Sequence, residues 1–199
     1  MSTTTRVKRQ KEEVNGSGQI IHYGDICIAR YWYEESRFLN YDSLNCVYKF
    51  MAIWLAFNFL YAEYNSINPN KNCQSEREAI ENYCTKRKAI IEKADIFNNF
   101  SGEVAVLTEK PVTSLNKISS SSKRTNGNDK DWSLINQNGA TDINSDDFAR
   151  FQSLIQIIYT VRCNLFHGAK NPANERDYNL VYASARIIEF LVGELIKTE

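Results

Sequence analysis

Apolar residues recur at helical spacing through most of the chain and predict five helices. The predicted ranges are about 26–39, 43–64, 76–100, 145–167 and a last helix that follows Asn171-Pro172. The second range is apolar nearly all round, which is typical of a helix surrounded by others. Ser75 and Glu78 have the spacing of a capping box at the start of the third helix. Gly168 is expected to end the fourth helix, and Pro172 suits the first turn of the fifth.

Residues 102–144 break this pattern. Val104–Leu107 and Pro111–Leu115 supply at most short extended pieces, and the run from Ser119 to Asn128 has low complexity. The stretch is longer than compact connections need, so it indicates a functional or disordered insertion. Residues 1–22 are expected to form a mobile polar tail. The prediction is one all-α domain over 23–199, a bundle of four to five helices with a long irregular insertion.

Net charge and cysteine content favour a cytoplasmic protein without a strong overall charge. Lys and Arg total 24, as do Asp and Glu, so no overall field draws the chain to nucleic acid or membrane. Five cysteines without a C-x-x-C pair indicate reduced thiols in the cytoplasm. The apolar run from Cys46 to Tyr61 is interrupted by Lys49 and Asn58, and it falls short of the roughly 20 residues of a membrane span. We therefore expect a buried central helix and no membrane.

The fourth helix carries a charge where its apolar stripe calls for a core residue. That residue is Arg162. The other members of the stripe are Phe148, Phe151, Ile155, Ile158 and Leu165. Arginine is almost never buried without a partner. Either the stripe opens onto a cleft at Arg162, or the side chain meets an anion there, or it is a structural residue bonded to carbonyls or a carboxylate.

Two strings of residues resemble HEPN domains, a helical superfamily of ribonucleases and toxins in prokaryotic defence, toxin-antitoxin and RNA-processing systems. Arg162-Cys163-Asn164-Leu165-Phe166-His167-Gly168 is similar to their R-x4-6-H motif. Trp54-Leu55-Ala56-Phe57-Asn58-Phe59-Leu60-Tyr61 resembles the W-x-A-F-N-x-L-Y helix of stand-alone HEPN families such as the Apea-like group. With the helix order, the resemblance covers about 23–197 without the insertion. Cys163 departs from the polar residue common after the arginine, and Ala169 from the tyrosine often found two residues after the histidine.

The resemblance implies a homodimer in which two such motifs line one cleft and cleave RNA without metal. Arg162 and His167 are then the catalytic residues. Histidine, with an ordinary pKa of about 6.5, exchanges a proton near neutral pH, and the arginine fork matches phosphate oxygens. Residues five apart lie about 140° apart around a helix. The pair therefore does not share one face, and a single copy makes an incomplete site unless the helix end brings both groups into one cleft.

Other residues are weaker candidates. Asn58 and Asn164 are expected to support the site, and Lys170 and Arg176 to contact RNA phosphates. No cofactor or metal is expected, because His22 is remote from the motif in sequence. RNA, a second copy and an antitoxin or defence-system protein are the expected partners. A non-catalytic HEPN module that binds RNA or protein, and a helical scaffold dimer in which Arg162 and His167 only tie helices together, remain open.

Overall fold

The body of the protein is all-α. The computed structural model describes residues 13–14, 20–21, 24–67, 75–110, 112, 147–167, 171 and 173–198. The five longer helices are α1 Gly24–Arg37, α2 Ser43–Ile67, α3 Glu76–Lys86, α8 Asp147–Phe166 and α9 Glu175–Ile196. Three short helices follow α3, and these are α4 Lys88–Ala94, α5 Ile96–Asn99 and α6 Ser101–Thr108. The prediction of an all-α fold is confirmed for the described body of the chain.

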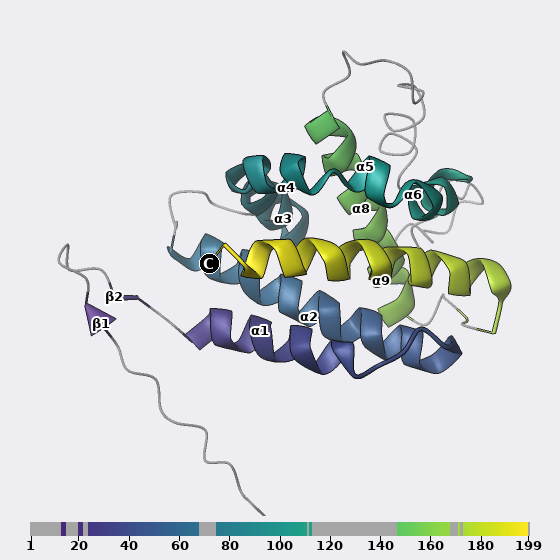
Figure 1. The fold of residues 1–199 in the computed structure, drawn as a ribbon, viewed down its shortest axis with the longest axis horizontal. Coiled ribbons are helices and arrows are strands. Elements are labelled where there is room, and N and C mark those ends of the chain that lie inside the picture. The colour runs from purple at the N-terminus through teal and green to yellow at the C-terminus, as the bar shows by residue number, and fades with distance from the viewer. Residues whose placement is uncertain are drawn as a thin grey trace, which may run out of the picture.

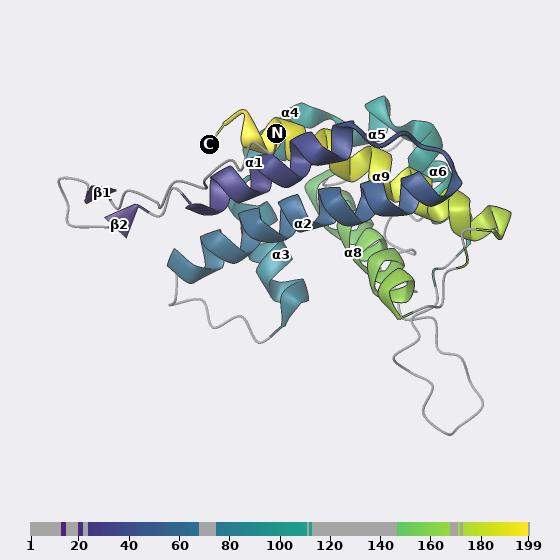
Figure 2. The ribbon, with the colours of Figure 1, turned by 90° about the horizontal axis from the view of Figure 1, so that it is seen from below.

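Helix α2 is the centre of the bundle. It packs against α1 and α9, which run beside it, while α8 crosses them (Figures 1 and 2). Its buried residues include Phe50, Ile53, Trp54, Ala56, Phe57 and Leu60. By length and composition Leu44–Ser66 is apolar enough to cross a membrane, but 61% of the segment tested is buried inside the protein. The all-round apolar pattern therefore matches a helix with neighbours on several sides.

The predicted third helix is a series of shorter helices. The chain breaks at Arg87 and again at Asp95, which adopts the left-handed conformation with φ of 46°. Asp and Asn tolerate this conformation better than other side chains do. Asn98 Nδ2 donates to both carboxylate oxygens of Asp95 at 2.9 Å. These breaks let the chain bend while Ile80, Tyr83 and Ala94 all remain buried.

Two other predicted boundaries are wrong. Val104–Leu107 was expected to be at most extended, yet it lies in helix α6, where Val104 and Leu107 are buried beside α9. Residues three apart lie on one face of a helix, so the helical conformation lets Val104 and Leu107 both pack against α9. Pro172 is not in the first turn of α9, because that helix starts at Glu175 and the Asn174 side chain caps it.

The predicted tail contains a short antiparallel pair, β1 Glu13–Val14 with β2 Ile20–Ile21. The β-branched residues of β2 suit a strand. The low-complexity run and most of the predicted insertion lie outside the described residues, as do Gly168 and His22. Of the insertion beyond α6, Val112 is described and is buried.

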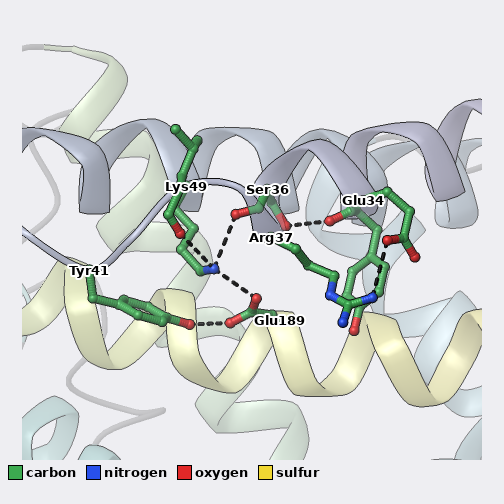
Figure 3. Close-up of polar contacts among 8 residues, drawn as sticks. Glu34, Ser36, Arg37, Tyr41, Lys49 and Glu189 are labelled. Atoms are coloured by element: carbon green, nitrogen blue, oxygen red, sulfur yellow. Dashed lines mark hydrogen bonds and ion pairs between the residues drawn. The ribbon is translucent and has the colours of Figure 1, made fainter.

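A buried polar cluster ties α1, α2 and α9 together (Figure 3). Lys49 Nζ donates to the carbonyls of Ser36 and Leu39 at 3.1 Å each and lies 2.8 Å from Glu189 Oε1. The Tyr41 hydroxyl donates to the other carboxylate oxygen of Glu189. Burial, and then this hydrogen bond, raise the pKa of Tyr41. These residues form the Lys49 cluster, which neutralises a buried lysine and caps the end of α1.

Candidate functional site

Arg162 faces the place where α8, α2 and the first turn of α3 meet. Its Nη1 lies 3.4 Å from Glu76 Oε2. Its guanidinium carbon lies 5.8 Å from the centre of the Trp54 ring and 4.7 Å from that of Phe166. Figure 2 shows α3 and α8 on the same side of α2. The charged residue in the apolar stripe therefore meets an anion, and this anion is a carboxylate of the same chain.

The carboxylate of Glu76 is itself held by α2. The Tyr61 hydroxyl donates to Glu76 Oε1 at 2.5 Å, and Asn58 Nδ2 donates to the Tyr61 oxygen at 2.5 Å. Burial and the hydrogen bond to Glu76 raise the pKa of Tyr61, so this hydroxyl remains a donor at neutral pH. Asn58 is thus linked to Arg162 through two other side chains. The Arg162 cluster comprises Trp54, Asn58, Tyr61, Glu76, Arg162 and Phe166.

The guanidinium of Arg162 keeps donors that no described residue uses. Nη1 contacts Glu76 and also lies 3.9 Å from Cys163 Sγ. Nε is buried and has no hydrogen-bond partner within the described part of the chain. The Arg162 side chain is 24% exposed and that of Glu76 is 28% exposed. Because a guanidinium has five N–H donors and this side chain is partly exposed, donors other than the buried Nε are available to a further oxygen ligand.

His167 makes no contact with the Arg162 guanidinium among the described contacts of one copy. It follows the last residue of α8 and is exposed, and its backbone N–H donates to the carbonyl of Cys163 at 3.0 Å. Among the described contacts, the Arg162 side chain bonds to Glu76 and Cys163 and not to His167. One copy therefore presents the cation toward α2 and α3 and the imidazole at the helix end.

The remaining predicted residues lie at different depths. Asn164 is buried in α8 and does not reach the surface. Arg176 is exposed in the first turn of α9 and its Nη2 donates to the carbonyl of Lys110 at 3.3 Å. Lys170 lies outside the described residues. The structure thus brings Asn58 to the Arg162 cluster and leaves Asn164 and Arg176 outside it.

Sequence reasoning missed Glu76, Tyr61 and Phe166. The arginine in the stripe indicated a missing anion, but nothing in the spacing selected Glu76, which is 86 residues away. Arg77, its neighbour, donates to Gln156 Oε1 at 2.9 Å and to Thr160 Oγ1 at 3.1 Å. This crossing of α3 and α8 places Glu76 against Arg162. A search for acidic residues at helix starts would have included Glu76, because carboxylates favour that position.

Two other features of the described chain bear on binding chemistry. A pocket of about 250 Å³ lies beside the first turn of α8. Its lining is apolar and acidic, and comprises Ile91, Glu92, Asp95, Ile96, Phe97, Asp147, Phe148 and Phe151. Among the described residues, that lining has no cation for a phosphate. In the described parts of the chain, no three His, Cys, Asp or Glu residues gather as a metal site.

Comparison of the chain with protein-family models, with curated proteins and with solved structures finds no match.

Proposed function

We propose that this protein is a metal-independent endoribonuclease of the HEPN type that acts as a homodimer. The observation that supports the proposal is the meeting of two strings about a hundred residues apart, each of which resembles a HEPN motif. Trp54 of the first string contacts Arg162 of the second. Tyr61 of the first string, which accepts a hydrogen bond from Asn58, donates to the carboxylate bound to Arg162.

The chemistry follows from the two side chains. His167 takes the proton of a ribose 2′-hydroxyl, whose oxygen attacks the adjacent phosphorus. Arg162 stabilises the charge that develops on the phosphoryl oxygens. The P–O5′ bond breaks, and a second protonated group, which we assign to His167 of the other copy, gives a proton to the leaving oxygen. The products are a 2′,3′-cyclic phosphate and a 5′-hydroxyl.

The proposal of a dimer rests on the separate positions of Arg162 and His167 in one copy. The guanidinium contacts Glu76 and two aromatic rings, while His167 is exposed at the end of α8. A second copy that brings its own helix end to the first supplies the group that one copy lacks. We place this dimer in the cytoplasm, as the effector of a toxin-antitoxin or defence system whose partner protein restrains it.

A non-catalytic module that binds RNA or protein is the second candidate. It is favoured by the carboxylate already bound to Arg162 and by the balanced net charge, since RNA-binding domains are commonly basic. Such a module binds RNA without cutting it. A pure scaffold binds none.

Incubation of the full-length protein with total RNA in EDTA separates these functions. Wild-type protein is expected to release fragments with 2′,3′-cyclic phosphate ends, and Arg162→Ala and His167→Ala to release none. Arg186→Ala is the matched control, because Arg186 also lies 3.4 Å from a glutamate, Glu103, and over aromatic rings, but on α9. The absence of wild-type cleavage, or equal cleavage by all variants, would reject catalysis by this site.

A further inference from the structure

Phe166 is an exposed aromatic residue that contacts Arg162 and directly precedes His167 in the chain. It is the last residue of α8, directly before His167, and it is 48% exposed. Its ring lies 4.7 Å from the guanidinium carbon of Arg162. The Arg162 guanidinium also lies over the ring of Trp54, which is buried. The inner contact of the guanidinium is therefore with Trp54 and the outer one with Phe166.

We propose that Phe166 is a stacking platform for one unpaired base of the RNA, next to the phosphate that Arg162 binds. This inference rests on the proposed function and names its substrate class, which is single-stranded RNA. Phe38 is also exposed, but Phe166 differs from it because its ring lies against a cation that can hold an RNA phosphate beside the base. Aromatic side chains that stack on splayed bases are a common means of binding single strands.

The arginine prepares the ring for this role. A cation over one face of an aromatic ring is attracted to it, which fixes the ring and reduces the entropy that stacking would cost. Glu76 and Trp54 hold the guanidinium in turn. A base on the exposed side of Phe166 would continue the stack outward from Trp54 and Arg162. Its own phosphate then lies within reach of the unused guanidinium donors.

The position also restricts the substrate. Bases in a duplex are covered by their neighbours in the stack, so they cannot lie flat on Phe166 without being unpaired first. All four bases have a π-face, so stacking by itself selects strandedness rather than sequence. We therefore infer a preference for loops and single strands with little dependence on the stacked base.

The test measures binding in a His167→Ala background, which keeps Phe166 and removes the proposed acid-base group. The probes are a single-stranded RNA of about 12 nucleotides and a set of the same RNA with one abasic nucleotide at each position in turn. Phe166→Leu should weaken binding of the intact RNA by roughly 5- to 100-fold, the range for one lost base stack. Phe166→Tyr, which keeps the ring, should bind as the parent does.

The abasic set identifies the stack itself. The parent should lose a similar factor for an abasic nucleotide at one position, and Phe166→Leu should show no further loss there. Phe38→Leu is the matched control, because Phe38 is 85% exposed and makes no cation contact among the described residues. It should bind as the parent does.

Two results would overturn the inference. One is equal binding by Phe166→Leu and the parent, with wild-type cleavage intact, which removes the platform but leaves the nuclease. The other is a change in oligomeric state on light scattering caused by Phe166→Leu, because the ring would then belong to a protein interface. Absence of wild-type cleavage rejects the proposed function instead, and the binding comparison can still be read.

Discussion

The Lys49 cluster and the Arg162 cluster are built from the same kinds of residue and differ in what remains unused. Each contains a cation, a glutamate and a tyrosine whose hydroxyl donates to the second carboxylate oxygen. Lys49 is 5% exposed, and its three N–H donors meet two carbonyls and Glu189. Arg162 is 24% exposed and has an Nε without a partner in the described structure. A buried cation whose donors are all used ties helices together, whereas a partly exposed cation with unused donors can bind a ligand.

The aromatic rings beside Lys49 and Arg162 also differ in their exposure. Lys49 lies 4.6 Å from the ring centre of Tyr41, which is half-buried, so the cation has no open side. Arg162 has buried Trp54 on one side and exposed Phe166 on the other. The comparison predicts that changes in the Lys49 cluster alter stability and that changes around Arg162 alter activity.

The largest effect is expected at His167. Replacement by Ala should lower the cleavage rate by about 10²- to 10⁴-fold, because positioned acid-base groups contribute factors of this size. Its exposure predicts an unchanged unfolding midpoint. Rates measured with a labelled single-stranded RNA test this, and the wild-type rate should rise and then fall between pH 5 and 8. A flat profile would remove the assignment of one histidine as base and the other as acid.

Lys49→Met should lower the free energy of unfolding by about 3 kcal/mol. It strands the Glu189 carboxylate and two carbonyls in the interior, and breaking a buried pair costs about 3–5 kcal/mol, with the lower end expected because Glu189 retains some contact with water. Urea unfolding measures the change. Lys88→Met, in the exposed pair with Glu92, is the control and should cost under about 0.5 kcal/mol. A change in cleavage per folded Lys49→Met molecule would contradict the separation of the clusters.

Tyr61→Phe should have a smaller effect on both properties. It removes the donor that orients Glu76, at a cost of about 1 kcal/mol in stability, and it should reduce cleavage several-fold without abolishing it. Tyr41→Phe removes the equivalent bond to Glu189 and should reduce stability alone. Parallel unfolding and cleavage assays of both variants make the comparison. Equal cleavage losses in the two variants would show that the clusters do not differ in function.

Alkaline pH should produce the smallest change. The pKa values of Tyr41 and Tyr61 are raised in the folded protein, first by burial and then by the hydrogen bonds to glutamate. Above pH of about 10, the unfolded chain therefore loses these protons first and folding stability falls as pH rises. Tyr41→Phe or Tyr61→Phe should each make this fall shallower in unfolding titrations. A fall that is unchanged in both variants would contradict the shifts.

The sequence predicted the helices correctly where local apolar spacing or a capping residue marks them. An all-round apolar run specified the central helix α2, and Ser75 accepts the N–H of Glu78 as the cap spacing predicted. The breaks at Arg87 and Asp95 were missed because the apolar stripe continues through them and neither is Gly or Pro. Packing against α8 and α9 determines those bends, and local spacing does not encode it.

The candidate site was predicted in part for the same reason. An arginine in an apolar stripe indicates that an anion or a cleft is near, and Glu76 meets the first of these. The choice of this glutamate among the acidic residues depends on how α3 crosses α8, which is long-range information. The exposure of Phe166 likewise depends on which helices end beside it. The local apolar pattern indicated Arg162, and the tertiary fold determines that Glu76 and Phe166 contact it.

The Arg162→Ala variant tests most directly whether Arg162 acts in RNA cleavage. Cleavage per folded molecule and the free energy of unfolding are measured on the same preparation. We predict that cleavage in EDTA falls about 10²- to 10³-fold, since the charge on the transition state loses its cation, while stability changes by less than about 1 kcal/mol because Glu76 is reached by water. Arg186→Ala should retain cleavage. Unchanged cleavage together with a stability loss like that of Lys49→Met would contradict the account and make Arg162 a second structural tie.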